Sequence, residues 1–415
     1  MGKRTIYILL IISNMLLIQH HGYATNKDTK DSIPPTLKYQ RLSQILDSLS
    51  FLIKSQNEGI VTPDNFSSQP YDNTPDLVFE YRMEALNQKT PIQLTYNKTV
   101  KHFIDFYLVK NKSLVSKIMG LSEFYFPLFE AELDKNNLPM ELKYLPVIES
   151  ALNPNARSRS GAVGLWQFIY DTGKLLGLKT NSYIDERKDP IKSTQAACEY
   201  LSYLYAVFGD WQLVLAAYNS GPGTVKKAIE RSGGKTNFWE IRPYLPRETR
   251  NYVPIFIAVN YVFAYAEMHQ IKAKPFVFRH FDVDTIATTK RISFYALSQK
   301  IGVPVQTLAF LNPEYKLKIK PVTNKPMPIV LPREAISRFL YHQEAIFSAS
   351  SASYTAPSKP KVKIIHTVAK GEYLHKLEIK YKVSKESIKA WNNLSSDVLH
   401  TNQKLVIWVP KDTLQ

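Results

Sequence analysis

The sequence predicts a multidomain α+β protein, in which a predominantly α-helical domain is followed by small βααβ modules. A chain of 415 residues with 44% hydrophobic and 21% charged residues has the composition of a globular protein of two or three domains. Apolar residues recur at helical spacing over residues 101–272. After Lys274-Pro275, short β-type runs surround pairs of helices, which indicates a domain boundary.

The N-terminus has the features of a secretory signal peptide over residues 1–24. Lys3 and Arg4 precede the apolar run Ile6 to Ile18, and Gly22-Tyr23-Ala24 supplies a cleavage site. The alternative, an uncleaved membrane anchor, is less favoured because the run is shorter than the roughly 20 residues that span a bilayer. We therefore expect secretion to the periplasm or cell envelope.

The only cysteine, Cys198, excludes an intramolecular disulfide and a cysteine-rich metal site. It also lies far from the predicted cleavage site, so we do not expect a lipoprotein. There is no His-Glu-x-x-His pair and no calcium-loop pattern, and we expect neither a metal nor a cofactor. The protein is expected to be a monomer.

Residues 25–100 are polar and contain several prolines, with one amphipathic helix candidate around Leu42 to Ile53. The formal charge of +17 attracts polyanions, but the sequence has no nucleic-acid-binding motif, and nucleic acid is not expected as a partner. In an exported protein the expected anionic partners are cell-wall peptide carboxylates and the headgroups of the envelope membrane, contacted peripherally.

Glu149 is an acidic residue in the apolar run Leu145 to Ser150. If the run is helical, Leu142, Leu145 and Leu152 share its face. A carboxylate on such a face is poorly solvated, which raises its pKa and suits it to donate a proton at neutral pH. The alternative is a buried structural glutamate whose oxygens are satisfied by hydrogen bonds.

Three further motifs follow Glu149-Ser150 along the chain. They are Gly164-Leu165-Trp166-Gln167-Phe168, Ala216-Ala217-Tyr218-Asn219-Ser220-Gly221 and Glu248-Thr249-Arg250-Asn251-Tyr252-Val253. Together the four resemble the soluble lytic transglycosylase family, whose pattern is Glu-Ser, Gly-Leu-x-Gln, Ala-Tyr-Asn-x-Gly and a late Tyr. The resemblance covers roughly Lys101 to Met268 and implies a lysozyme-like, predominantly α catalytic domain over residues 101–272.

The resemblance implies a role for each matching residue, with Glu149 as the catalytic acid. The implied substrate-binding residues are Ser150, Gln167, Tyr218, Asn219 and Tyr252. Ser150 would bond near the acid, Gln167 and Asn219 would contact sugar or N-acetyl groups, and the tyrosines would line the cleft. Structural alternatives are a helix cap for Ser150, a left-handed turn for Asn219 and a core position for Tyr218.

In this family one glutamate protonates the glycosidic oxygen and then removes the proton from the C6 hydroxyl of the same muramic acid, closing a 1,6-anhydro ring. The resemblance thus implies cleavage of the MurNAc-GlcNAc β-1,4 bond during cell-wall remodelling. Glu248 is expected to form a structural ion pair with Arg250. Two alternatives are a lysozyme-type hydrolase using Asp171, Asp185 or Asp189 as a second carboxylate, and a non-catalytic peptidoglycan-binding scaffold.

Residues 363–411 resemble the LysM carbohydrate-binding module. A strand over Ile364 to Val368, a helix over Tyr373 to Tyr381, a second helix capped by Ser384 and a closing strand over Leu405 to Pro410 give the order βααβ. Glu372-Tyr373 replaces the usual Asp-Thr of the family. The resemblance implies binding to glycan strands, and the alternative is a packing module without a ligand.

Residues 280–333 align with this module as a degenerate copy. Val303 corresponds to Val383, and Leu311-Asn312 corresponds to Trp391-Asn392. Residues 346–362 are rich in Ser, Ala, Pro and Lys, which is typical of a flexible linker. This domain order resembles the D type of membrane-bound lytic murein transglycosylases, and tethered modules would act by avidity on a polymer.

Overall fold

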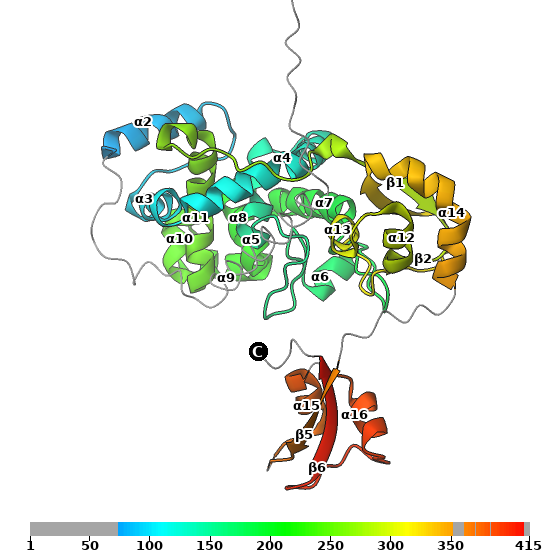
Figure 1. The fold of residues 1–415 in the computed structure, drawn as a ribbon. Helices are drawn as coiled ribbons and strands as arrows, with labels where there is room; N and C mark the ends of the chain where they lie inside the picture. Colours follow the sequence, from blue (N-terminus) through cyan, green and yellow to red (C-terminus); the bar gives the residue numbers. More distant parts are fainter. Residues whose placement is uncertain (1–73, 352–360, 370, 382, 411–415) are drawn as a thin grey trace, which may run out of the picture.

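The computed structural model describes residues 74–351, 361–369, 371–381 and 383–410 (Figure 1). Three hydrophobic cores organise them: one in a helical domain, one in a first small module and one in a C-terminal module. This arrangement confirms the predicted multidomain α+β class. The predicted signal peptide and the helix candidate at Leu42 to Ile53 lie outside the described residues.

The helical domain is built around α11 (Arg247–Ala264), which is buried along most of its length and packs against α3 and α8. The other helices of the domain are α2 (Asp76–Asn87), α3 (Lys98–Asp105), α4 (Lys112–Lys135), α5 (Leu145–Ser150), α6 (Tyr170–Leu175), α7 (Pro190–Phe208), α8 (Trp211–Ser220), α9 (Pro222–Arg231) and α10 (Phe238–Ile241). Short turns join them: a π-helical turn η2 (Phe106–Lys110) and the 3-10 helices η3 (Met140–Tyr144), η4 (Arg242–Tyr244) and η5 (Glu267–His269).

This domain begins earlier than predicted. The boundary expected at residue 101 is wrong, because Phe79, Met83 and Ile92 are buried in the core of the helical domain. Helix α2 buries only Phe79 and Met83, so its apolar periodicity is weak in the sequence. The first turn of α3 is capped by Asn97, whose side chain accepts a hydrogen bond from the Val100 amide at 3.0 Å.

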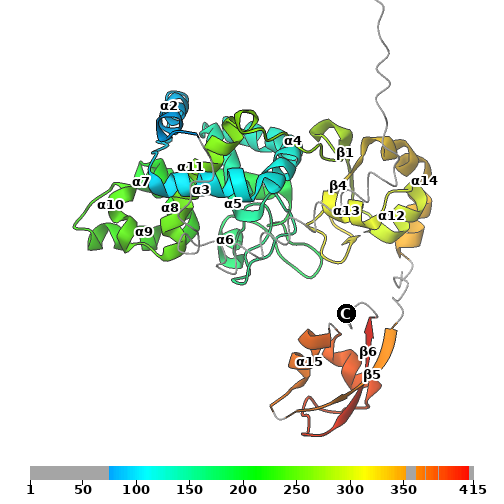
Figure 2. The ribbon, with the colours of Figure 1, turned by 60° about the vertical axis from the view of Figure 1, so that its left-hand side comes forward.

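The first module contains two small antiparallel sheets and three α-helices. Its elements are η6 (His280–Asp282), β1 (Val283–Thr288), β2 (Ile292–Ser293), α12 (Phe294–Ile301), α13 (Val305–Leu311), β3 (Ile319–Lys320), β4 (Met327–Pro332), η7 (Arg333–Ala335) and α14 (Ile336–Ser351). Strand β1 pairs with β4, and β2 pairs with β3. In Figures 1 and 2 this module adjoins the helical domain.

The junction between the first module and the helical domain is a packed interface. The Asp185 amide donates to the Glu314 carbonyl at 2.9 Å, and the Lys316 amide donates to the Tyr183 carbonyl at 2.8 Å. Ile184 belongs to the core of the module, while Phe310 belongs to the core of the helical domain. The two units therefore share both backbone pairing and apolar surface.

The C-terminal module has the predicted βααβ order. It comprises β5 (Lys361–Thr367), α15 (Leu374–Tyr381), α16 (Lys385–Trp391) and β6 (Lys404–Pro410). Ser384 caps α16 as expected, accepting from the Ser387 amide. The linker predicted from residue 346 begins too early, because α14 continues to Ser351 and buries Ile346 and Ser350. The Ser and Ala residues of this segment are compatible with a helix as well as with a flexible linker.

The two modules share a detail that supports their alignment. Asn312 donates to the Val330 carbonyl at 2.8 Å and accepts from the Val330 amide at 2.7 Å. Asn392, the aligned residue, makes the same two bonds to Val406 at 2.8 and 2.7 Å. Each asparagine thus ties the second helix to the closing strand, so the aligned positions have the same structural role.

None of the helices in the described part of the chain is both long enough and apolar enough to span a bilayer.

Candidate active site

Glu149 lies in the last turn of the short helix α5. Pro146 occupies the first turn, where the missing N–H removes no hydrogen bond because N–H groups at this position have no partner within the helix. The helix ends at Ser150 because Ala151 and Leu152 adopt left-handed backbone conformations, with φ of 49° and 61°. Leu152 is buried but lies beyond the helix, and Leu142 lies before it in the 3-10 helix η3. The prediction that Leu142, Leu145 and Leu152 share the face of one helix is therefore wrong at both ends.

The carboxyl group of Glu149 is in a poorly solvated environment, as predicted. Burial raises its pKa to about 7, and the nearby charge of Glu248 acts in the same direction. Tyr252 in α11 opposes them, because its hydroxyl donates to Glu149 Oε1 at 2.6 Å and favours the carboxylate. At neutral pH both the protonated and the ionised form of the group are therefore populated, so it can donate or accept a proton.

Ser150 faces the protein interior. The side chain is fully buried, and its hydroxyl lies 2.9 Å from the carbonyl oxygens of both Pro146 and Leu165. A substrate cannot reach this hydroxyl, so the substrate-binding role expected for Ser150 is corrected to a structural one. It holds α5 against the Gly164-Leu165 segment and thereby fixes Glu149 relative to Gln167.

Gln167 is half-buried in a loop and has a left-handed backbone with φ of 50°. Its Nε2 donates to the Gly164 carbonyl at 2.8 Å. This contact orients the amide and leaves Oε1 as an acceptor that no described hydrogen bond uses. Gly164 is required here, because a Cβ at this position would lie 2.1 Å from the Arg187 carbonyl oxygen and φ is 85°.

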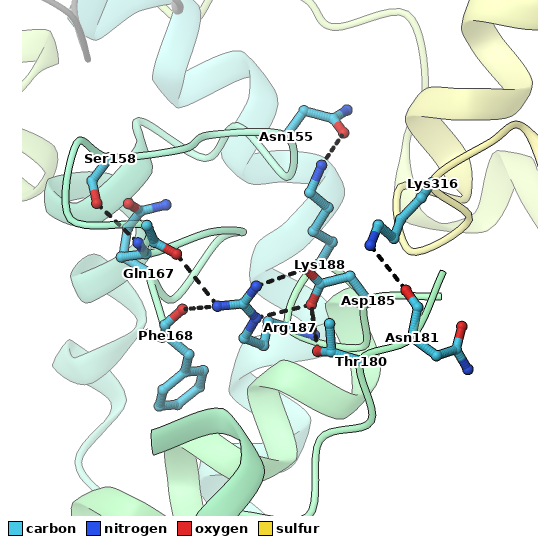
Figure 3. A network of polar contacts seen from close by, with 12 residues as sticks. Asn155, Ser158, Gln167, Phe168, Thr180, Asn181, Asp185, Arg187, Lys188 and Lys316 are labelled. Carbon is cyan, nitrogen blue, oxygen red and sulfur yellow. Dashed lines mark hydrogen bonds and ion pairs between the residues drawn. The ribbon is translucent and has the colours of Figure 1, made fainter. Parts of the chain in front are cut away.

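A buried arginine holds the loops beside Gln167 together (Figure 3). Arg187 forms a two-pronged ion pair with Asp185, from Nε at 2.9 Å and from Nη2 at 2.8 Å. Its Nη1 also donates to the Phe168 carbonyl at 3.2 Å and the Gly161 carbonyl at 3.3 Å. One side chain thus ties together the segments before and after Gln167.

The aspartates considered as a second carboxylate are occupied or exposed. Asp185 is buried in the pair with Arg187, which keeps its pKa low although burial acts to raise it. Asp189 caps α7 by accepting from the amides of Ile191 and Lys192. Asp171 is exposed at the start of α6. Neither buried aspartate is available to activate a water molecule.

Tyr218 and Asn219 lie at the end of α8. The Tyr218 hydroxyl donates to the Trp166 carbonyl at 2.8 Å, and the charge of Glu149 contributes to raising its pKa, so the ring lies close to the acid. Asn219 Oδ1 accepts from the Thr249 hydroxyl at 2.8 Å. This bond leaves the Asn219 Nδ2 group as a donor that no described hydrogen bond uses.

Glu248 was misassigned from the sequence. Among the described residues it forms no ion pair with Arg250, whose Nε donates instead to the Leu245 carbonyl at 2.7 Å. Glu248 is exposed in the first turn of α11, and its charge raises the pKa of both Glu149 and Tyr252. The four-residue spacing from Glu248 to Tyr252 was the available signal, because it places both on one face of a helix.

Models of three protein families match successive segments of the chain. The Transglycosylase SLT domain model matches residues 126–240, the model for the LysM-like domain of lytic transglycosylase MltD matches residues 282–347, and the LysM domain model matches residues 366–408. The chain is 30% identical to membrane-bound lytic murein transglycosylase D of Escherichia coli (strain K12) over 307 residues, covering 72% of this chain and 66% of that protein.

Two further relatives match smaller parts. Soluble lytic murein transglycosylase of Escherichia coli (strain K12) is 34% identical over 125 residues, which is 28% of this chain and 19% of that protein. Among solved structures, the 70 kDa soluble lytic transglycosylase SLT70 from Escherichia coli aligns over 58% of this chain and 45% of its own, with 20% identity and a TM-score of 0.31. The chain thus spans about two thirds, or less, of the length of each of these relatives.

Proposed function

Since the chain belongs to the lytic murein transglycosylase family, we propose that it cleaves the MurNAc-GlcNAc β-1,4 bond of peptidoglycan and leaves 1,6-anhydro-MurNAc ends. The observation that carries the proposal is the environment of Glu149, whose pKa is raised to about 7 while Tyr252 bonds to its carboxyl oxygen. An acid that gives up a proton and takes one back needs a pKa near the working pH.

In the proposed reaction, protonated Glu149 transfers its proton to the glycosidic oxygen as the bond to C1 of MurNAc breaks. The resulting carboxylate, stabilised by the Tyr252 hydroxyl, removes the proton from the C6 hydroxyl, and O6 bonds to C1. Glu149 gives up one proton and takes one back, so it ends the reaction in its starting protonation state. Because the nucleophile belongs to the same sugar, holding the ring in the reactive pose supplies much of the rate.

Two polar side chains suit recognition of an acetamido group. Gln167 Oε1 can accept from its N–H, and Asn219 Nδ2 can donate to its carbonyl, since the other ends of both amides are held by protein contacts. Tyr218 and Tyr252 supply the walls of the cleft beside Glu149. These roles rest on the match to the family motifs and on the orientation of the two amides.

We further propose that residues 1–24 direct export, that the protein acts as a monomer in the periplasm or cell envelope, and that both modules bind glycan strands. The positive charge of the chain favours peripheral contact with the anionic envelope membrane.

The test is mass spectrometry of the soluble products after purified peptidoglycan is incubated with the wild-type protein and with Glu149→Gln. Anhydro-muropeptides from the wild type, reduced at least about 1,000-fold in the variant, would support the proposal. Reducing-end muropeptides would identify a hydrolase instead. If neither protein released products, a binding scaffold would be the better description.

A further inference from the structure

A basic cavity lies between the N-terminal turns of α3 and α11. It has a volume of about 520 Å³, and four basic side chains line it: Lys98, Arg242, Arg247 and Arg250. His102 and Asn251 complete most of the wall, and none of the lining residues is acidic. A concave surface with this density of positive charge is a site for an anion.

Two of the arginines are held in place by backbone contacts. Arg242 Nε donates to the Arg250 carbonyl at 2.8 Å, and Arg250 Nε donates to the Leu245 carbonyl at 2.7 Å. Each bond uses only the Nε–H, so it fixes the guanidinium plane without using the terminal N–H donors. Preorganised guanidinium groups bind planar oxyanions such as carboxylates with two parallel hydrogen bonds.

Two of the cavity cations, Arg242 and Arg250, repel one another. Burial and the neighbouring positive charge of Arg250 lower the pKa of Arg242, which means that the two guanidinium groups lie close enough to repel. The nearest acidic side chain of α3, Asp105, is bound to Lys101 at 3.0 Å. A bound oxyanion would relieve this repulsion, so the cavity favours a negatively charged ligand.

We propose that this cavity binds a free carboxylate of the peptide carried by the glycan substrate. The inference rests on the proposed function and extends it, because it makes a peptide-bearing strand the preferred substrate. Asn251 and Arg250 precede Tyr252, the residue bonded to Glu149, by one and two positions in α11. The cavity therefore lies on another face of the same helical turn, and in this proposal the peptide of a strand bound at Glu149 extends around α11 to reach it.

The same cations would also attract a lipid phosphate, but the lining of the cavity favours the peptide of the glycan strand. A membrane-binding surface is broad and exposes apolar side chains that enter the headgroup region. The lining of the cavity contains no apolar residue. Its volume suits a short acidic peptide segment, and the substrate of the proposed reaction carries such peptides along its length.

The test compares Lys98→Glu, Arg242→Gln and a matched control on two substrates. Lys98 is exposed in the first turn of α3, where a glutamate is favourable for the helix, so the variant is expected to fold. Lys227→Glu in α9 makes the same charge change at an exposed residue outside the cavity. The substrates are glycan strands with intact peptides and the same strands after an amidase has removed the peptides.

On peptide-bearing strands we expect both cavity variants to raise KM about tenfold, the loss typical of a charged hydrogen bond, while the control keeps the wild-type value. On stripped strands all four proteins should have equal KM. An equal loss on both substrates would overturn the inference, because it would indicate damage to the cleft.

Direct binding separates this inference from the proposed function. The soluble tetrapeptide of the substrate, with free carboxylates, should bind wild-type protein at least about tenfold more tightly than Lys98→Glu, and its methyl ester should bind both equally weakly. This holds whether or not glycan is cleaved, whereas a wild type inactive on both strands would refute only the proposed function. Peptide binding unaffected by Lys98→Glu, with loss of sedimentation on phosphatidylglycerol vesicles, would assign the cavity to lipid and refute the inference.

Discussion

Replacing Tyr252 by phenylalanine tests how the pKa of Glu149 is set. The wild-type hydroxyl donates to Glu149 Oε1 at 2.6 Å and lowers a pKa that burial raises, with a balance of about 7. A hydrogen bond to a charged group is worth about 1.5–3 kcal/mol, and one pH unit corresponds to about 1.4 kcal/mol. We therefore expect the pKa of Glu149 in Tyr252→Phe to be about 1 to 2 pH units higher.

The assay is the pH dependence of kcat/KM for release of anhydro-muropeptides. Because Glu149 must carry a proton to start the reaction, the rate falls as pH rises through its pKa, and this alkaline limb should move to higher pH in the variant. The titration of the Glu149 carboxyl carbon by NMR would report the same change without turnover. The rate at the optimum should fall, because the carboxylate formed after proton transfer loses its donor.

Tyr218→Phe is the matched control for this experiment. It also removes one phenolic hydroxyl near Glu149, but that hydroxyl donates to the Trp166 carbonyl and not to the carboxyl group. Its alkaline limb should therefore stay at the wild-type pH even if its rate changes. A limb in Tyr252→Phe that is unchanged, or moved to lower pH, would refute the argument that the hydroxyl stabilises the carboxylate.

Three further predictions concern stability. Gly164→Ala should lower the free energy of unfolding by about 3 kcal/mol or more, because its Cβ would lie 2.1 Å from the Arg187 carbonyl oxygen. Gly177 has a similar φ but nothing within 4 Å of an added Cβ, so Gly177→Ala should lower it by only about 1–2 kcal/mol. Equal melting temperatures of the two variants would contradict this prediction. Burial raises the pKa of Glu314 well above its usual value, so the folded state loses stability as pH rises from the unfolded-state pKa through the folded-state pKa. Glu314→Gln should therefore melt at a higher temperature than the wild type at pH 8 but not at pH 4. The opposite order would refute a protonated Glu314 in the folded state. Hydrogen bonds from the Ala369 amide and the His366 ring lower the pKa of Glu372 to about 2, so the stability that the carboxylate contributes is present above the unfolded-state pKa and is lost as pH falls through about 2. Calorimetry at pH 7 should therefore show that Glu372→Gln lowers the melting temperature of the C-terminal module. An unchanged melting temperature would show that these bonds contribute nothing to its stability.

The raised pKa of Glu149 and the fold of the C-terminal module could both be predicted from the sequence. An acid in an apolar run predicts a raised pKa whatever the details of the helix, and the βααβ pattern follows from turn residues and strand alternation. The end of α5 was not predictable, because Ala151 and Leu152 adopt left-handed conformations that apolar residues seldom take and that surrounding packing imposes.

Roles that depend on the orientation of a side chain could not be predicted from the sequence either. Ser150 and Glu149 are adjacent in sequence, yet the Ser150 side chain is fully buried whereas Glu149 is partly exposed. The start of the helical domain was missed because α2 buries only two side chains, and the burial of Ile346 and Ser350 in α14 could not be seen in a run of small residues. In each case tertiary packing decides what local composition leaves open.

The interface that joins the first module to the helical domain determines which parts of this chain can be exchanged during evolution. Since Ile184 completes the core of the module and Phe310 completes the core of the domain, neither half can be replaced by an unrelated copy without a matched change in the other. Among the described residues, the core of the C-terminal module is made of residues of that module alone. It is therefore the part that can be gained, lost or duplicated while the rest of the molecule is inherited as a single unit.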